Sequence, residues 1–225
     1  MEPAYLFAKA VLKPWLKTWF RWHIEGLDCV PPTGPAIVAF NHIAYLDPFA
    51  AAYALDAAGR RPRFLAKSEL FADRRIAWII RGTGQIEVNR GSRDAPAALE
   101  HAYRALEQGE LVVVFPEGTI TRDPELKPMA AKTGAARLAL GSGAPLIPAA
   151  VWGTQNIWPK GYAKHWAPRQ DILVRIGTPI GAQGDPHDHA ACRALSDRLM
   201  EAISGLVAAL RPVVPDRRRP KKSAA

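Results

Sequence analysis

The sequence predicts a single α/β domain built on a central, mainly parallel or mixed sheet that is flanked by helices, with an amphipathic helical arm at the N-terminus. Short apolar runs alternate with segments of helical periodicity, which is typical of an α/β sheet. The 225 residues have 48% hydrophobic content, enough to bury a substantial core. We therefore divide the chain into an arm (1–23), a domain (24–210) and a tail (211–225).

The predicted strands are apolar runs bounded by turn residues, over 36–40, 85–89, 111–115, 146–151 and 171–176. Helices are expected between them. Asp94-Ala95-Pro96 opens one that Gly109 closes, residues 133–140 form another, and residues 187–210 form a long C-terminal helix. Asp47 is expected to cap a further helix that has Pro48 at its first position.

The N-terminal arm is predicted to be a helix with two unlike sides. At about 100° per residue, its apolar side contains Ala4, Ala8, Val11, Leu12, Trp15, Trp19 and Trp22. Its basic side contains Lys9, Lys13, Lys17 and Arg21. Such a helix suits a membrane interface, and the alternative is a helix that packs on the domain. Pro14 is expected to kink the helix or split it in two.

The net charge of +9 is distributed unevenly. The arm carries +3 and the tail +5, which leaves +1 for residues 24–210. Basic ends around a nearly neutral domain indicate contact with a membrane surface that contains anionic lipids. A nucleic-acid-binding protein explains the charge less well, because the domain is almost neutral and no aromatic-basic RNA motif occurs. The tail is expected to be disordered, and to bind anionic lipid or keep the protein soluble.

No apolar run approaches the roughly 20 residues that a membrane-spanning helix needs, and the start of the chain lacks the basic region of a signal peptide. We therefore expect a peripheral or monotopic protein on the cytoplasmic face of the cell membrane. Cys29 and Cys192 form no disulfide framework, which fits a reducing cytosol.

A histidine and an aspartate stand where a predicted strand meets a predicted helix. His42 and Asp47 enclose four residues just after the strand over 36–40. A neutral imidazole there can take a proton from a hydroxyl group, while the carboxylate orients the ring and stabilises the imidazolium that forms. The alternative is that Asp47 only caps the helix and His42 only fills a loop. The motifs that follow favour a catalytic base and its partner.

The chain offers no nucleophile of its own for this base. No Gly-x-Ser-x-Gly turn occurs, and the two cysteines have neither metal spacing nor a Cys-x-x-Cys pattern. The hydroxyl that His42 activates is therefore expected to belong to a substrate. This indicates direct transfer onto an acceptor alcohol rather than a covalent enzyme intermediate.

Two further segments offer groups that can hold a ligand. The strand over 111–115 ends in Pro116-Glu117-Gly118-Thr119, where Gly118 allows close backbone approach and its neighbours offer oxygens. The strand over 85–89 delivers Arg90, which can grip a phosphate in bidentate fashion, and Lys67 upstream adds a point charge. In isolation, such segments are usually an ordinary turn and solvated surface cations.

Taken together and in this order, these segments resemble the glycerolipid acyltransferase family, whose best-known members are the 1-acylglycerol-3-phosphate acyltransferases. That family carries an Asn-His-x4-Asp box, a Gly-x-Ile-x-Val-x-Arg-like box, a Phe-Pro-Glu-Gly-Thr box and an Ile-Pro-Val-like box. The matching residues here are 41–47, 84–90, 115–119 and 146–149. Segments 67–71 and 132–136 are also similar. Agreement of several ordered boxes, over roughly residues 24–180, is far more specific than one motif.

The resemblance implies a role for each matched residue. His42 is the general base and Asp47 its partner. The implied substrate-binding residues are Asn41, Lys67, Arg90, Glu117, Gly118 and Thr119, among which Arg90 and Lys67 hold the acceptor's phosphate. Two departures occur: Ile120 and Thr121 separate Arg122 from Gly-Thr, and Asn89 replaces the aspartate that often precedes the arginine.

The implied reaction moves a fatty acyl group from acyl-coenzyme A or acyl-carrier protein to the free hydroxyl of 1-acylglycerol-3-phosphate, and the product is phosphatidic acid. The acyl carriers are co-substrates, and no cofactor or metal is expected. His187-Asp188-His189 is interpreted as an exposed turn rather than a metal site. The alternatives are another acceptor (glycerol-3-phosphate, a lyso-amino lipid or a glycolipid) and a non-catalytic membrane lipid-binding protein of the same fold.

Overall fold

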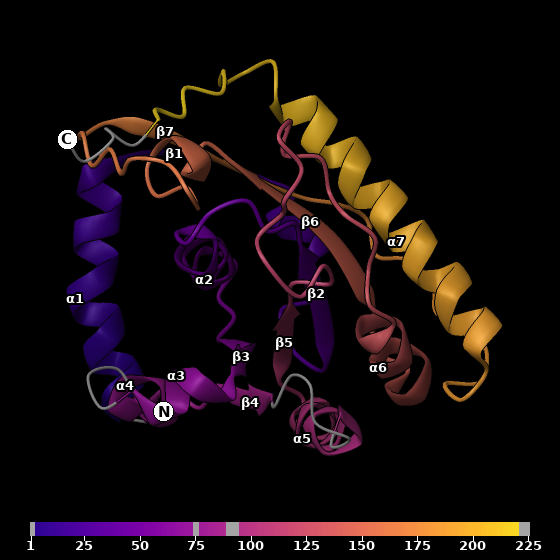
Figure 1. The fold of residues 1–225 in the computed structure, drawn as a ribbon. Helices are drawn as coiled ribbons and strands as arrows, with labels where there is room; N and C mark the ends of the chain where they lie inside the picture. The colour runs from indigo at the N-terminus through magenta and orange to yellow at the C-terminus, as the bar shows by residue number, and fades with distance from the viewer. Residues whose placement is uncertain (1–2, 74–76, 89–94, 221–225) are drawn as a thin grey trace.

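A mixed sheet of seven strands organises the chain in the computed structural model, which describes residues 3–73, 77–88 and 95–220 (Figure 1). Its strands are β1 (Phe20–Glu25), β2 (Ala36–Phe40), β3 (Pro62–Lys67), β4 (Ile86–Val88), β5 (Leu111–Val114), β6 (Leu146–Trp152) and β7 (Gln170–Ile176). They lie in the order β1-β7-β6-β2-β5-β3-β4. β6 and β7 run antiparallel, whereas the other neighbouring pairs are parallel.

The central strands are apolar along their whole length. Every residue of β2, β5 and β6 is buried, as expected for strands that are covered on both faces. Alternate residues supply the two sides of the sheet. Ile37 and Ala39 belong to one apolar cluster, and Val38 and Phe40 belong to the other.

Helices cover both faces of this sheet (Figure 1). One face carries α5 (Ala95–Glu107), α6 (Gly134–Ser142) and α7 (His189–Leu210). The other carries α1 (Pro3–Trp19) and α2 (Asp47–Ala57). The short helices α3 (Ser68–Ala72) and α4 (Ala77–Gly82) lie between β3 and β4, and the 3-10 turns η1 (Leu27–Cys29) and η2 (Thr154–Asn156) follow β1 and β6.

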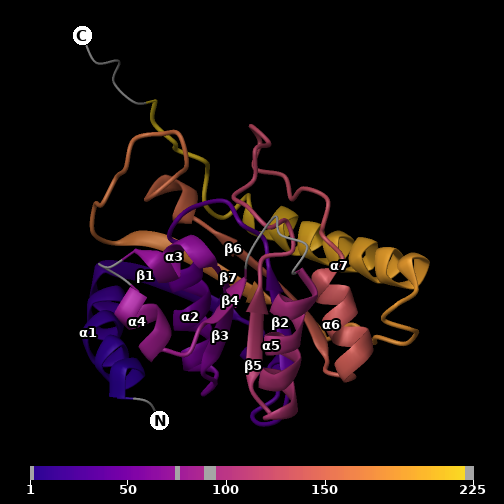
Figure 2. The same cartoon turned by 60° about the horizontal axis from the view of Figure 1, so that its bottom comes forward.

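The connections that leave β2 and β5 go to opposite faces of the sheet. β2 leads into α2, whereas β5 leads through a long connection to α6 on the other side. Figure 2 shows this long connection extending beyond the ends of the strands. In open α/β sheets, ligands bind where neighbouring connections part in this way. The carboxyl ends of β2 and β5 are therefore the edge at which a site is expected.

The predicted α/β domain with a central mixed sheet flanked by helices is confirmed, and the predicted strands correspond to β2, β4, β5, β6 and β7. Residue 89 of the predicted strand over 85–89 lies outside the described residues. The three helices predicted after residue 94 correspond to α5, α6 and α7. β3 was missed because it begins with a proline and contains Arg63 and Lys67, so it looks polar. Arg63 of β3 forms an ion pair with Glu110, the residue just before β5, and this pair accommodates the arginine's charge within the sheet.

The helical arm is shorter than predicted, because α1 ends at Trp19 and the next six residues form β1. β1 pairs in parallel with β7. Its burial alternates with a period of two, and Arg21 and His23 on the exposed side lie 2.8 and 3.0 Å from Asp171. Trp22 stacks on Tyr53 of α2, with ring centroids 4.0 Å apart. Pro14 lies inside α1.

α1 turns part of its basic side toward the domain and leaves apolar side chains outside. Lys9 and Lys13 each lie 2.5 Å from the Asp56 carboxylate of α2. Burial tends to raise the pKa of Asp56, but hydrogen bonds from the two lysines outweigh burial and hold it below its usual value. Phe7 and Val11 are 59% and 54% exposed. Within the described ranges, no helix combines the length and apolar character needed to cross a bilayer.

The first part of the tail lies against the domain, whereas the sequence predicts a disordered tail. The Asn156 side chain donates to the Pro215 carbonyl at 3.0 Å and accepts from the Arg217 N–H at 2.6 Å. The Arg218 guanidinium lies 4.8 Å from the centre of the Tyr162 ring. These contacts give Pro215, Arg217 and Arg218 specific partners in η2 and in the loop that follows it. Residues 221–225 lie outside the described residues.

Candidate active site

His42 follows directly after β2, and its backbone is held on both sides. Its N–H donates to Glu117 Oε1 at 2.9 Å, and its carbonyl accepts from the Thr121 N–H at 2.7 Å. Its ring stacks on Phe115, with centroids 4.4 Å apart and planes 27° from parallel. The turn after β5 therefore fixes the imidazole at the edge where the connections of the sheet diverge.

Asp47 holds the His42 imidazole from the start of α2. The ring nitrogen Nδ1 lies 2.8 Å from Asp47 Oδ2. The Asp47 side chain is fully buried, whereas that of His42 is 17% exposed. Because Nδ1 is engaged by the carboxylate, Nε2 is the nitrogen that can accept a proton from a substrate. In the described part of the chain, no group forms a hydrogen bond with Nε2.

Four donors surround the Asp47 carboxylate. Besides His42, the N–H groups of Ile43 and Ala44 donate to Oδ2 at 2.6 and 2.8 Å, and the Thr154 hydroxyl donates to Oδ1 at 2.6 Å. These bonds compensate the buried charge for its removal from water.

The prediction that Asp47 caps its helix is wrong. Leu46 occupies the N-cap position, no side chain makes a cap hydrogen bond, and Asp47 is the first residue of α2 with Pro48 in the first turn. The Asp47 carboxylate turns back to the donors of residues 42–44 instead. The loop between β2 and α2 therefore folds around the Asp47 carboxylate, which accepts hydrogen bonds from His42, Ile43 and Ala44.

Glu117 lies in the turn after β5 and is buried. Its two oxygens accept backbone N–H groups, Oε1 from His42 and Oε2 from Met129, both at 2.9 Å. Burial raises the pKa of the Glu117 carboxyl, although these two bonds oppose the shift. The structure therefore gives this carboxylate a positioning role. Direct contact with a substrate stays a prediction.

Gly118 and Thr119 complete the same turn. Gly118 has a φ of 72°, in the left-handed region that favours glycine. A β-carbon there would lie 3.1 Å from Cε of Lys132, so the lysine stem passes closely over the turn. Thr119 is partly exposed beside it. The substrate contacts predicted for both residues stay predictions.

Asn41 has a different place from the one predicted. Its side chain is fully buried, its Oδ1 accepts from the Val151 N–H at 2.8 Å, and its Nδ2 donates to the Val151 carbonyl at 3.1 Å. The amide therefore ties the end of β2 to β6 and is not open to a substrate. This clamp fixes the residue that immediately precedes His42.

The two predicted phosphate ligands are not both described. Arg90 lies outside the described residues, and for Lys67 only the backbone, at the end of β3, is described. The Lys67 backbone is in register with Val88, the last residue of β4. The roles of Arg90 and Lys67 stay predictions.

Two residues at the site were given no role from the sequence. Thr154 contacts Asp47 from 107 positions away. Lys132 passes over Gly118, and its backbone N–H donates to the Pro116 carbonyl at 2.9 Å. The available signal for Thr154 was a Gly-Thr pair directly after an apolar strand; the Gly118-Thr119 pair also comes shortly after such a strand.

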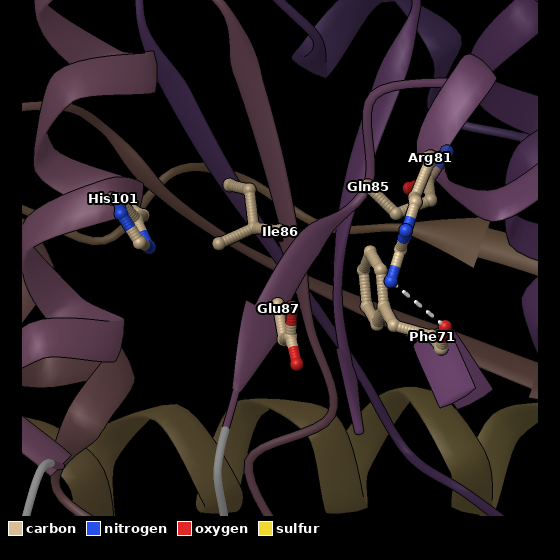
Figure 3. A pocket seen from close by; sticks show the side chains of 6 residues that line it. All are labelled: Phe71, Arg81, Gln85, Ile86, Glu87 and His101. Carbon is tan, nitrogen blue, oxygen red and sulfur yellow. Dashed lines mark hydrogen bonds between the residues drawn. The ribbon is translucent and has the colours of Figure 1, made fainter. Parts of the chain in front are cut away.

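A separate cavity of about 370 Å³ lies beside β4 (Figure 3). Its lining residues are Phe71, Arg81, Gln85, Ile86, Glu87 and His101. Arg81 donates to the Phe71 carbonyl at 3.1 Å across one side of it. The lining comes from α3, α4, β4 and α5, whereas the His42–Asp47 pair lies where β2 leads into α2.

Among the described residues, no three His, Cys, Asp or Glu side chains gather as a metal site would require. The His187-Asp188-His189 segment leads into α7, which begins at His189. Asp188 caps this helix by accepting from the Ala190 N–H at 2.8 Å, and His189 Nδ1 lies 3.4 Å from the Arg137 guanidinium.

The fold and this site define a class of protein. The model of the family described as Acyltransferase matches residues 21–152, a range that includes the His42–Asp47 pair and the Glu117 turn. The chain belongs to this acyltransferase family.

Similar proteins include named 1-acyl-sn-glycerol-3-phosphate acyltransferases. The chloroplastic protein BAT2 of Brassica napus is 30% identical, covering 81% of this chain and 51% of its own length. The chloroplastic LPAT1 of Arabidopsis thaliana is 31% identical, with coverages of 82% and 50%. The chain thus spans about half the length of these curated relatives. The crystal structure of the 1-acyl-sn-glycerophosphate acyltransferase PlsC from Thermotoga maritima matches with a TM-score of 0.65 and 26% identity, over 91% of this chain and 78% of that one.

Proposed function

We propose that this protein transfers a fatty acyl group from acyl-coenzyme A or acyl-carrier protein to the free hydroxyl of 1-acylglycerol-3-phosphate, giving phosphatidic acid. The observation that carries the proposal is the His42–Asp47 pair, in which Nδ1 is bonded to a buried carboxylate and Nε2 is left for a substrate. The names of the plant and Thermotoga maritima relatives support this choice of acceptor.

In the proposed reaction, His42 Nε2 accepts the proton of the acceptor hydroxyl while its oxygen attacks the thioester carbonyl carbon. A carbon–oxygen bond forms, and collapse of the tetrahedral intermediate breaks the carbon–sulfur bond. The proton then passes from the imidazolium to the leaving thiolate, which departs as the free thiol. Asp47 stabilises the imidazolium in between, so the acyl group never resides on the protein.

The remaining residues hold the reactants in this proposal. Arg90 and Lys67 bind the phosphate of the acceptor, the role that the family resemblance implies for both; Lys67 is the last residue of β3. Gly118 and Thr119 line the acceptor site. Glu117 acts through the backbone of His42, because it accepts the His42 N–H. In this proposal the acyl donor is a co-substrate, and the reaction needs no cofactor.

We also propose that the protein binds the cytoplasmic face of the cell membrane as a peripheral or monotopic protein, through α1. Leu6, Phe7 and Val11 of α1 are exposed, and α4, which lies beside α1 in Figures 1 and 2, exposes Trp78 to 56%. Exposed apolar side chains on neighbouring helices favour contact with the apolar part of a membrane. Anionic lipids attract the nearby Lys17 and the basic tail.

The proposal is tested by incubating the purified protein with 1-acylglycerol-3-phosphate and palmitoyl- or oleoyl-coenzyme A, and in parallel with an acyl-carrier-protein donor. Free thiol and the lipid product are followed by mass. We expect phosphatidic acid and an equal amount of free thiol. If glycerol-3-phosphate or a phosphate-free lipid is acylated instead, the protein is an acyltransferase but 1-acylglycerol-3-phosphate is not its acceptor. If no acceptor is acylated, the result would favour the alternative of a non-catalytic lipid-binding protein.

A further inference from the structure

Thr154 brings a hydroxyl to the Asp47 carboxylate from a distant part of the chain. It is the first residue of η2, separated from the end of β6 by Gly153 alone, and its side chain is fully buried. Its Oγ1 donates to Asp47 Oδ1 at 2.6 Å, whereas the other three donors reach Oδ2. A distance of this size falls in the range of charge-assisted bonds from a hydroxyl to a carboxylate, which are stronger than neutral ones.

The backbone around Thr154 is fixed before any substrate binds. Gly153 has a φ of 96°, and a β-carbon there would lie 2.2 Å from the Asp171 carbonyl oxygen. The Gly153 N–H donates to the side-chain oxygen of Gln155 at 2.7 Å. The Thr154 carbonyl accepts from the N–H groups of Ile157 and Trp158, both at 3.0 Å. The hydroxyl is therefore held in place by a rigid turn.

We propose that Thr154 is a positioning residue for acyl transfer, whose hydroxyl fixes the rotation of the Asp47 carboxylate so that Oδ2 faces His42 Nδ1. The reasoning starts from the division of the donors. Three donors on Oδ2 set where that oxygen lies, but the second oxygen needs its own partner to set the plane of the carboxylate. Thr154 is that partner, and it orients the imidazole through Asp47 without touching a substrate.

The kinetic side of this inference rests on the proposed function. The near-isosteric Thr154→Val variant removes the hydroxyl and keeps the volume, whereas Thr154→Ser keeps the hydroxyl. Ser196→Ala is a matched control, since the Ser196 hydroxyl is also buried and donates to the Cys192 carbonyl at 2.8 Å in α7.

We expect Thr154→Val to lower kcat about tenfold while KM for donor and acceptor stays within about twofold, because the lost bond is made to a charged group. Thr154→Ser should recover most of the loss, and Ser196→Ala should leave kcat unchanged. A Thr154→Val variant with full kcat would overturn the inference, and so would a Thr154→Ser variant as slow as Thr154→Val.

A double-mutant comparison with Asp47→Asn distinguishes an effect of Thr154 that acts through Asp47 from a general effect on folding. In an Asp47→Asn background the carboxylate is already lost, so adding Thr154→Val should change the residual rate by less than about twofold. Independent, multiplicative losses from the two substitutions would contradict a route through Asp47.

A readout that needs no substrate is the proton resonance of His42 Nδ1–H, assigned by its disappearance in His42→Ala. We expect it to shift in Thr154→Val, to return in Thr154→Ser and to stay in place in Ser196→Ala. If the unmutated protein transfers no acyl group but the resonance shifts, the proposed function fails and the positioning role stands. A resonance that does not move would overturn the positioning role whether or not the enzyme is active.

Discussion

The Glu117→Gln substitution distinguishes a carboxylate that holds the active-site backbone from one that binds substrate. In the structure, the two carboxylate oxygens of Glu117 each accept a hydrogen bond from one backbone N–H at 2.9 Å, one from His42 and the other from Met129. A glutamine keeps the size of the side chain but replaces one oxygen with an NH2 group. That group cannot accept a hydrogen bond, so one of the two backbone N–H groups loses its partner.

The expected cost follows from this count of bonds. A hydrogen bond to a charged acceptor contributes about 1.5–3 kcal/mol, and the uncharged glutamine recovers part of this because its burial costs less. We therefore expect the free energy of unfolding to fall by roughly 2 kcal/mol. For a chain of 225 residues, this corresponds to a decrease in Tm of about 4 °C.

The Glu117→Gln variant should also be slower. Whichever of the two bonds is lost, the turn that holds His42 is disturbed, and a small displacement of the proposed general base should lower kcat by about tenfold or more. The assay combines a thermal unfolding scan with steady-state kinetics for the acceptor. Glu201→Gln is the matched control, since Glu201 is exposed on α7 and its Tm and kcat should not change.

The pH dependence of stability gives a second test of the same carboxylate. Burial raises the pKa of Glu117 in the folded protein above its unfolded value of 4.5. The folded state therefore holds this proton more tightly, and its contribution to stability declines as pH rises from about 4.5 through the folded pKa. The stability of the unmutated protein relative to Glu117→Gln should accordingly decrease over that window, as measured by urea unfolding.

One result would refute this account of Glu117. If Glu117→Gln keeps its Tm and kcat but raises KM for the acceptor, the carboxylate binds substrate directly, as the resemblance implies, and does not hold the backbone of His42.

Two further predictions concern α1. Asp56→Asn removes the partner of Lys9 and Lys13 and should lower stability at pH 7 by roughly 1 kcal/mol, since both lysines are about 40% exposed and screened by solvent. The pKa of Asp56 is held below its unfolded value, so this difference should vanish as pH falls from about 3.8 through the folded pKa, as urea unfolding will show. Val11→Glu should bind anionic vesicles roughly tenfold more weakly in sedimentation assays, whereas Ala194→Glu, at an exposed position of α7 on the opposite face of the sheet, should bind unchanged. Equal losses in the two variants would argue against α1 as the membrane contact.

Local signals in the sequence were enough to predict the centre of the fold and the contact between His42 and Asp47. β2 is an uninterrupted apolar run, and His42 and Asp47 lie within one short loop beyond it. A contact between residues so close in sequence follows from chain geometry. The sequence therefore predicted these features without knowledge of the rest of the chain.

Features that depend on distant partners were missed or misinterpreted. β1 was assigned to a helix because three tryptophans continue a helical spacing, but pairing with β7, whose Asp171 lies 150 positions from Arg21, decides its conformation. Asn41 was interpreted as a substrate ligand, because its partner Val151 comes into reach only when β6 lies beside β2. Thr154 was overlooked for the same reason.

The most direct test of the central claim compares the unmutated protein with His42→Ala and with His187→Ala, whose imidazole lies in the exposed turn before α7. Acyl transfer to 1-acylglycerol-3-phosphate is measured at saturating donor, beside Tm for each protein. If His42 is the general base, His42→Ala loses at least about 100-fold in kcat with little change in Tm, and His187→Ala keeps full activity. A His42→Ala protein that forms phosphatidic acid at the unmutated rate would contradict the account.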